Sequence, residues 1–140
     1  MIPSFCAACG GKNLIPFTNE ILAVDDKRSV SGLSGVRCGY PDCGEIYLND
    51  ADHQRFCDAC DAAVLADRAA SQKMLRRVRK NLKLTQRAAA KLTGGGPNAF
   101  SRYERGEVQP LPAVLNLFKL LDKHPELIAE IREGGSQAVA

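Results

Sequence analysis

The pattern of apolar and polar positions divides the chain into a strand-like part and a helical part. Asn13 to Val24 and Arg28 to Arg37 contain short apolar and β-branched runs broken by proline, glycine and paired aspartates. Such runs predict short antiparallel strands. From Asp50 to Asp67 the apolar residues recur at helical spacing in an alanine-rich stretch, with Asn49 or Asp50 as the capping residue. The sequence therefore predicts strands that lead into a helix.

Five further helices are predicted in the C-terminal half. Each has apolar residues on one face, and most begin at a capping residue or a proline. They cover Lys73 to Lys83, Gln86 to Leu92, about eight residues that start at Pro97, a segment after Pro112 that contains Val114 to Leu121, and a segment that starts at Pro125. The predicted fold class is two-domain α+β, with a small β-rich N-terminal domain that includes a helix and an all-α C-terminal domain of five helices.

Changes in composition set the expected domain boundaries. Residues 1–67 form the β-rich domain, residues 68–72 a linker that is either helical or extended, and residues 73–133 the helical domain. Residues 134–140 have nothing to pack and are expected to form a disordered tail. A chain of 140 residues is long enough for two small domains of this kind.

The net charge of +3 conceals an acidic half and a basic half. Residues 1–70 carry six Lys or Arg and ten Asp or Glu, a net charge of −4, whereas residues 71–140 carry thirteen and six, a net charge of +7. A basic domain favours a polyanion as partner. The sequence shows neither an apolar run long enough to span a bilayer nor the pattern of a signal peptide. We therefore expect a cytoplasmic protein.

Four cysteines in two pairs indicate a metal site. Two residues separate Cys6 from Cys9, four separate Cys38 from Cys43, and a glycine follows the second cysteine of each pair. Four thiolates at tetrahedral corners satisfy Zn²⁺, and the glycines permit the tight turns of zinc knuckles. The alternative is a pair of disulfides, which the reducing cytoplasm disfavours. The predicted cofactor is one structural Zn²⁺ per chain, since four cysteines leave no open coordination position.

Two further cysteines, Cys57 and Cys60, lie in the first predicted helix. They are small buried thiols, a redox pair, or a metal pair that replaces one of the knuckles. A redox pair normally opens a helix after a strand in a thioredoxin-like setting, which is missing here. His53 precedes Cys57 by one helical turn, so a metal pair of these two residues is a further alternative.

A glycine turn and a short helix, Gly94 to Gly106, carry the pattern of a DNA recognition helix. Its two aromatic residues share a face suited to packing, while Asn98, Arg102 and Arg105 follow helical spacing on another face. Asparagine pairs with adenine and arginine with guanine in the major groove. We expect Asn98 and Arg102 to read bases; the alternative is a polar face that is only solvated.

The basic residues near this helix predict phosphate contacts. Lys73 to Lys83 holds six cations and no acid around an apolar face. The residues expected at phosphates are Arg76, Lys80, Gln86, Ser101 and Arg105. The last two predicted helices have apolar faces that can close a core and still leave surface for a second copy, so we expect a homodimer. Two-fold proteins place their recognition helices about 34 Å apart and read palindromic DNA.

Several of these segments resemble known families. Leu84-Thr85-Gln86 and Tyr103-Glu104-Arg105-Gly106 are similar to the Cro/repressor-type (XRE) helix-turn-helix domain. The stretches from Gly94 to Glu104 and from Leu121 to Leu127 resemble the MqsA (YgiT-type) antitoxins more specifically. That family joins an N-terminal zinc domain to such a C-terminal domain, so the resemblance covers nearly the whole chain.

The resemblance implies a type II antitoxin that is not an enzyme. Its zinc domain would neutralise an MqsR-like toxin, an mRNA-cleaving ribonuclease of the RelE type, and its dimeric C-terminal domain would repress the operon promoter. It would be a bacterial cytoplasmic protein, associated with the nucleoid when bound to DNA. In the family, zinc ligation corresponds to the two cysteine pairs named above, and base reading to Asn98 and Arg102.

The chain departs from the family pattern in three places. Pro97 precedes Asn98, the second cysteine pair is more widely spaced, and Cys57 and Cys60 lie outside the family's ligand set. Two other functions compete with the antitoxin. One is a zinc-ribbon transcription regulator without a toxin partner, and the other is a thiol oxidoreductase that uses Cys57 and Cys60. The enzyme has little support, because the sequence offers neither a Ser/His/Asp set nor a phosphate loop.

Overall fold

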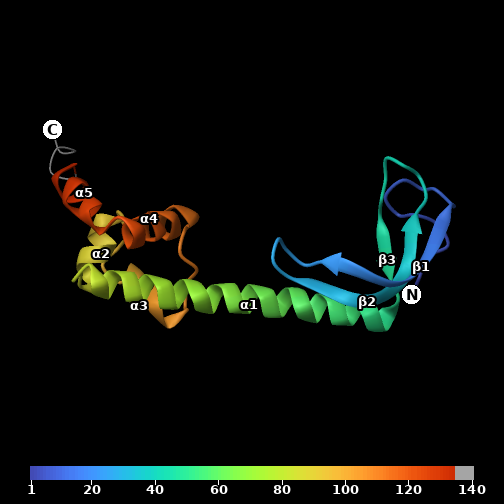
Figure 1. The fold of residues 1–140 in the computed structure, drawn as a ribbon, viewed down its shortest axis with the longest axis horizontal. Coiled ribbons are helices and arrows are strands. Elements are labelled where there is room, and N and C mark those ends of the chain that lie inside the picture. Colours follow the sequence, from blue (N-terminus) through green and yellow to red (C-terminus); the bar gives the residue numbers. More distant parts are fainter. Residues whose placement is uncertain (135–140) are drawn as a thin grey trace. The chain divides into compact units, whose positions relative to one another are not determined.

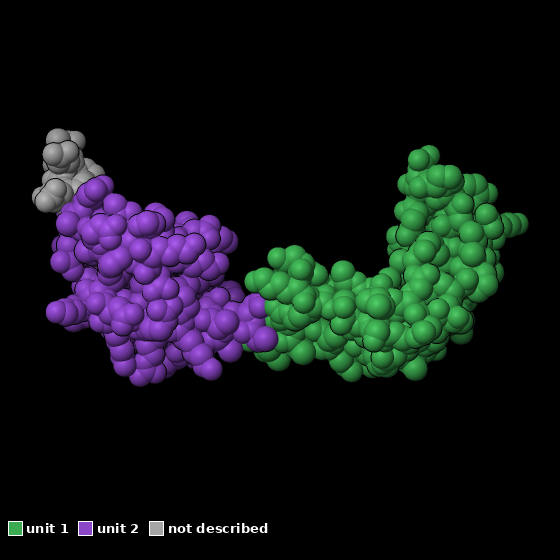
Figure 2. Space-filling view, in the orientation of Figure 1, with its two compact units in different colours: residues 1–65 green, residues 66–140 purple. Residues whose placement is uncertain are grey.

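The computed structural model describes residues 1–134 and divides the chain into two compact units (Figures 1 and 2). Unit 1 is Met1–Leu65 and unit 2 is Ala66–Ala140. Of the predicted tail, residues 135–140 lie outside the described residues, and Gly134 is the last residue of a helix. Within the described part of the chain, no helix combines the length and the apolar character that a membrane crossing requires.

Unit 1 contains a three-stranded antiparallel sheet in the order β1-β2-β3. Its strands are β1 (Leu14–Ala23), β2 (Ser29–Cys38) and β3 (Ile46–Leu48). The two predicted strands are confirmed, whereas β3 was not predicted, because three residues are too few to show a period. Gly35 of β2 allows β3 to approach: a Cβ atom there would lie 2.1 Å from the backbone oxygen of Tyr47.

Helix α1 (Asp50–Asn81) is one continuous helix of 32 residues. It replaces two predicted helices and the linker between them, so residues 68–72 are helical rather than extended. No glycine or proline interrupts this stretch, and alanine is frequent in it, which favours helix throughout. The Asn49 side chain accepts a hydrogen bond from the backbone N–H of Asp52 at 2.8 Å, so Asn49 is the cap.

The start of α1 is bound to the sheet through a buried carboxylate. Asp52 accepts hydrogen bonds from the backbone N–H of Ser34 in β2 and from Asn49, and it pairs with Arg55 at 2.7 Å. The hydrogen bond from Arg55 is the largest influence on the pKa of Asp52. It holds that pKa below its usual value, although burial alone would raise it. Arg55 also donates to the backbone oxygens of Ser31 and Gly32, so both members of the ion pair are hydrogen-bonded to β2.

Unit 2 is helical, as predicted. After the C-terminal half of α1 come α2 (Gln86–Leu92), α3 (Ala99–Arg105), α4 (Pro112–Lys123), the 3₁₀ turn η1 (Pro125–Leu127) and α5 (Ile128–Gly134). The core contains these fully or nearly fully buried side chains: Leu75, Val78, Leu84, Ala89, Ala90, Phe100, Val114, Phe118 and Leu121. Phe100 packs on Phe118 with ring centroids 5.0 Å apart. Alanines in α2 let that helix approach its neighbours closely.

The predicted recognition helix is α3, which begins at Ala99, two residues after the expected start at Pro97. The backbone N–H of Ala99 donates to the oxygen of Gly96 at 2.9 Å, which closes a turn with Pro97 and Asn98 at its centre. Asn98 has φ −100° and ψ 3°, values typical of the third residue of a type I turn. Proline presets φ for the second position of such a turn as well as for a helix start, so the sequence signal was ambiguous.

A buried ion pair joins three helices of unit 2. Arg79 of α1 makes two hydrogen bonds to Glu104 of α3, at 2.5 and 3.1 Å, and donates a third to the backbone oxygen of Leu84. Gln86 of α2 donates to the same carboxylate at 2.9 Å. The side chains of Arg79 and Glu104 are only 12% and 5% exposed. Burial acts to raise the pKa of Glu104, but the bonds from Arg79 and Gln86 and the charges of Arg79 and Arg76 bring it below its usual value.

We expect Glu104→Gln to lower the free energy of unfolding of unit 2 by about 3 kcal/mol, because it leaves the buried guanidinium of Arg79 without its counter-charge. This change is measured by urea unfolding of the full chain, with amide exchange in α3 used to monitor unit 2. Glu126→Gln removes an exposed carboxylate (69% exposed) and serves as control.

The pH dependence provides a second check on the same pair. Because the folded-state pKa of Glu104 is lowered, its contribution is complete above the unfolded value of about 4.3 and is lost as pH falls through the folded value. The stability difference between wild type and Glu104→Gln should therefore shrink in acid. An equal difference at pH 7 and at pH 3 would contradict the assignment.

Candidate metal centre and nucleic-acid interface

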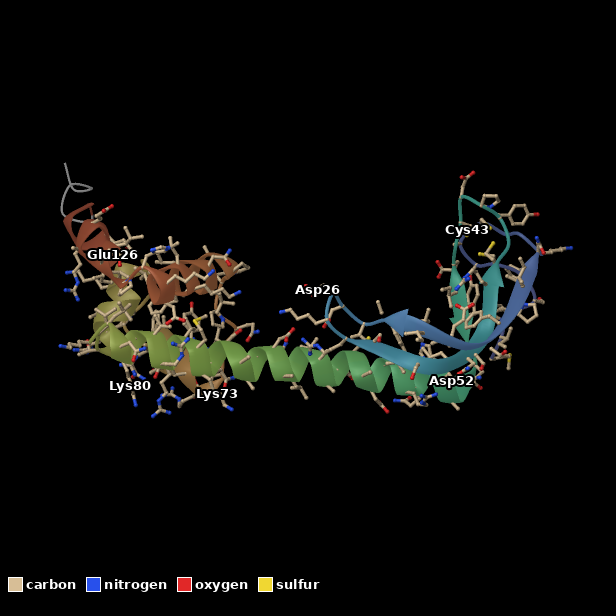
Figure 3. All side chains as sticks on the ribbon, viewed as in Figure 1. Asp26, Cys43, Asp52, Lys73, Lys80 and Glu126 are labelled. Carbon is tan, nitrogen blue, oxygen red and sulfur yellow. The ribbon has the colours of Figure 1, made fainter. Side chains whose placement is uncertain are left out.

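The four paired cysteines meet at one point in unit 1. Cys6 and Cys9 precede β1, Cys38 ends β2, and Cys43 lies in the loop before β3 (Figure 3). Their sulfur atoms all lie within 4.8 Å of one another. The Sγ atoms of Cys6 and Cys43 are 3.6 Å apart, as are those of Cys9 and Cys38. All six cysteines of the chain are free, so the disulfide alternative is not the observed state.

This geometry fits a tetrahedral metal ion. A metal–sulfur distance of about 2.3 Å places neighbouring ligands about 3.8 Å apart, close to the observed separations. Gly10 and Gly44, which follow the second cysteine of each pair, have φ +72° and +66°. The predicted role of these glycines is thus confirmed, since left-handed backbone is easy only for glycine. The four cysteines could hold a metal ion.

Tyr47 of β3 supports the cluster from outside. Its hydroxyl accepts from the backbone N–H of Ala7 at 2.7 Å and donates to the Cys6 sulfur at 3.5 Å. The bond from Tyr47 lowers the pKa of Cys6 most strongly. Together with bonds from the backbone of Cys9 and Ala8, it outweighs burial and brings that pKa to about 6. The sequence did not reveal this residue, because no ligand spacing marks a tyrosine.

The opposite shift occurs at Cys43. A bond from the backbone of Glu45 lowers its pKa, but the neighbouring Cys6 thiol, burial and the other two cysteines raise it to about 12. One thiolate therefore forms easily in the cluster, and a second is opposed by the first. A divalent cation bound between the sulfurs removes that opposition, because it offsets the charge of each thiolate.

Cys57 and Cys60 lie apart from this cluster, on α1, and both are half-buried. They line a groove of about 690 Å³ in unit 1, together with Leu22, Ile46, Tyr47, Leu48 and Phe56. The Cys57 sulfur is 3.8 and 3.9 Å from the two ring nitrogens of His53. Among the described residues, only the four paired cysteines bring three or more potential ligands together, so His53 and Cys57 remain a two-residue pair.

We expect strong chelation to unfold unit 1 and to leave the helical core of unit 2 intact. A small β domain depends on the roughly 10 to 16 kcal/mol of apparent binding energy that a structural Zn²⁺ provides. Amide exchange of the full chain before and after metal removal measures this effect. Cys43→Ser should abolish metal binding, while Cys57→Ser should leave the metal stoichiometry unchanged. Unaltered protection of β1 and β2 after complete metal removal would refute the prediction.

Helices α2 and α3 form a helix–turn–helix in unit 2. The packing face of α3 is as predicted, since Phe100 is fully buried and Tyr103 meets it edge-on at 5.7 Å. Asn98 and Arg102 are exposed, as base readers must be. Asn98 makes no side-chain capping bond, and its backbone oxygen accepts from the Ser101 hydroxyl at 3.1 Å.

The residues predicted at phosphates differ in their surroundings. Arg76 and Lys80 are exposed on α1, and Figure 3 shows Lys80 projecting into solvent. Arg105 is exposed at the end of α3. Gln86, by contrast, is half-buried and donates to Glu104, which gives its amide a structural contact.

An acidic residue that was not singled out in the sequence lies beside the two arginines of α3. Glu107 accepts two hydrogen bonds from Arg105, at 2.6 and 3.2 Å, and lies 3.7 Å from Nε of Arg102. The bond from Arg105 is the main reason why the pKa of Glu107 is below its usual value. Its place directly after the helix-ending Gly106 was the one available signal.

The fold and the two sites define a two-domain protein with a four-cysteine cluster that could hold a metal ion in one unit and a helix–turn–helix core in the other. Residues 4–132 match the family described as the antitoxin component of the bacterial toxin-antitoxin system, MqsA. The chain is also 42% identical over 109 residues to Antitoxin MqsA of Escherichia coli (strain K12), which covers 76% of this chain and 81% of that protein. The chain therefore belongs to the MqsA antitoxin family, which confirms the resemblance seen in the sequence.

Proposed function

We propose that this protein is a type II antitoxin that binds and neutralises an MqsR-like mRNA endonuclease through unit 1 and represses its own operon through unit 2. The observation that carries the proposal is the family match over residues 4–132, which spans both the cysteine cluster and the helix–turn–helix. The protein acts by binding alone and is not an enzyme. Because its toxin and its promoter are both in the bacterial cytoplasm, we place it there, on the nucleoid when it is bound to DNA.

The ion in the cysteine cluster is proposed to be one structural Zn²⁺ per chain. Four thiolates in tetrahedral arrangement suit Zn²⁺ and leave no position for a catalytic water. Cys6, Cys9, Cys38 and Cys43 would hold the ion, with Tyr47 orienting Cys6 through its hydroxyl. The metal would join the N-terminal segment to the β2–β3 loop and thereby shape unit 1.

Charge supports the toxin as the partner of unit 1. Its 65 residues carry five Lys or Arg and nine Asp or Glu, a net charge of −4. An enzyme that cleaves mRNA must attract phosphates, so its surface is expected to be basic and complementary to unit 1. Ile15 and Ile21 of β1 are 51% and 67% exposed and add apolar area for such a contact.

Unit 2 is proposed to bind palindromic promoter DNA as a homodimer. Asn98 and Arg102 would contact bases, and the residues at phosphates would be Arg76, Lys80, Gln86, Ser101 and Arg105. Exposed apolar side chains around α4, including Leu111 (65% exposed) and Leu120 (48% exposed), support a second copy as partner. The symmetric pair would place two α3 helices in successive major grooves.

Arg102→Ala and Asn98→Ala should each weaken binding to the protein's own promoter about tenfold or more, since a bidentate base contact contributes about 1 to 3 kcal/mol of discrimination. Binding to a scrambled duplex should change far less. Lys80→Ala should weaken both complexes alike and reduce the salt dependence by about one ion. Fluorescence anisotropy with both duplexes measures these effects, and equal losses on both for Arg102→Ala would refute base reading.

Co-expression with the protein encoded beside this one tests the antitoxin role. The full chain should restore growth against the neighbour's toxicity and co-purify with it in a stable complex. Cys43→Ser should abolish both effects by removing the metal, whereas Arg102→Ala should retain both, because it changes only the DNA interface. Promoter binding without rescue or a complex would instead support the zinc-ribbon regulator that has no toxin partner.

A further inference from the structure

The backbone fixes Glu107 at the end of α3. Gly106 adopts left-handed backbone with φ +76°, and its N–H donates to the oxygen of Tyr103 at 3.1 Å. The N–H of Glu107 donates to the oxygen of Arg102 at 3.0 Å, which completes a Schellman turn. Left-handed backbone of this kind favours glycine, so Gly106 suits this turn.

This turn places one carboxylate against two arginines of the proposed DNA interface. Arg105 engages both oxygens of Glu107, and Arg102 approaches one of them. All three side chains are about half exposed, at 54% for Arg102, 58% for Arg105 and 47% for Glu107. Water and DNA can therefore reach each of these groups, and phosphate can compete for the same guanidinium donors.

Stability alone does not account for an acid at this position. The C-terminal end of a helix carries partial negative charge, which disfavours a carboxylate there. Exposed ion pairs also contribute little to folding. Glu107 acts instead at the surface of α3, where its carboxylate pairs with the guanidinium groups of Arg102 and Arg105. DNA would otherwise accept hydrogen bonds from these groups.

We infer that Glu107 determines the specificity of the proposed DNA interface by competing with phosphate for Arg102 and Arg105. The inference rests on the proposed function. At the correct site, guanine offers Arg102 two acceptors in fixed geometry, which replace Glu107 well. On random DNA the arginines gain only phosphate contacts, and Glu107 both competes for them and repels the phosphate backbone. Glu107 thus penalises non-specific binding more than specific binding.

The test compares Glu107→Gln with Glu126→Gln, which makes the same charge change on η1 of the same unit. Dissociation constants of the full chain are measured by anisotropy for its own promoter fragment and for a scrambled duplex of equal length. Glu107→Gln should bind the scrambled duplex about three- to fivefold more tightly, the promoter less than twofold more tightly, and so lower the specificity ratio. Glu126→Gln should leave the ratio unchanged.

A double mutant separates local competition from a general charge effect. In an Arg102→Ala background, Glu107→Gln should change the specificity ratio much less, because the arginine that distinguishes the two duplexes is gone. An unchanged ratio for Glu107→Gln, or a change matched by Glu126→Gln, would overturn the inference while the proposed function stands. A wild type that does not prefer its promoter would overturn both. Circular dichroism verifies that each variant is folded.

Discussion

The position of α3 depends on the buried pair between Arg79 and Glu104. A carboxylate that is 5% exposed is stable only with its charge matched and its oxygens hydrogen-bonded, and Arg79 and Gln86 together meet both requirements. Since these partners come from α1 and α2, the pair orients α3 relative to both helices. The exposed side chains of Arg102 in α3 and of Asn98 directly before it are thus placed by a buried contact of the same helix.

In unit 1 the cluster of four cysteines has a comparable role, because it joins separate segments of the chain as the ion pair does in unit 2. Its sheet has three strands, one of them only three residues long, and little of it is fully buried. Four sulfurs converge instead at one end of the sheet, where β1 begins, β2 ends and β3 begins, and they lie within 4.8 Å of one another. Each unit therefore contains a cluster of polar or sulfur groups that joins segments distant in sequence, in addition to its apolar contacts.

The sequence predicted what depends on local pattern and missed what depends on tertiary contact. The paired cysteines with their glycines, the two long strands and the packing face of α3 all follow from spacing. The sequence left residues 68–72 as either helical or extended, because a change of charge there suggested a boundary; in the structure they are helical, since nothing there breaks a helix. The contact of Tyr47 with Cys6 and the Arg79–Glu104 pair were missed because each joins residues that are far apart in the sequence. The first pair is separated by 41 positions and the second by 25.

The same distinction changes the meaning of the basic charge in unit 2. Lys73 to Lys83 reads as six cations available for phosphates, yet Arg79 is buried against Glu104 and Arg77 makes two hydrogen bonds to Asp122 of α4. Asp122 and Glu104 already match the charges of these two arginines, and the pair of Arg79 with Glu104 is buried. The arginines available to DNA in the proposed complex are therefore fewer than the net charge suggests. Two of these, Arg102 and Arg105, also lie against the carboxylate of Glu107. An arginine that is already paired with a carboxylate must break that ion pair before it can contact a phosphate or a base. The ability of such a domain to distinguish DNA sequences therefore depends less on its total charge than on these ion pairs.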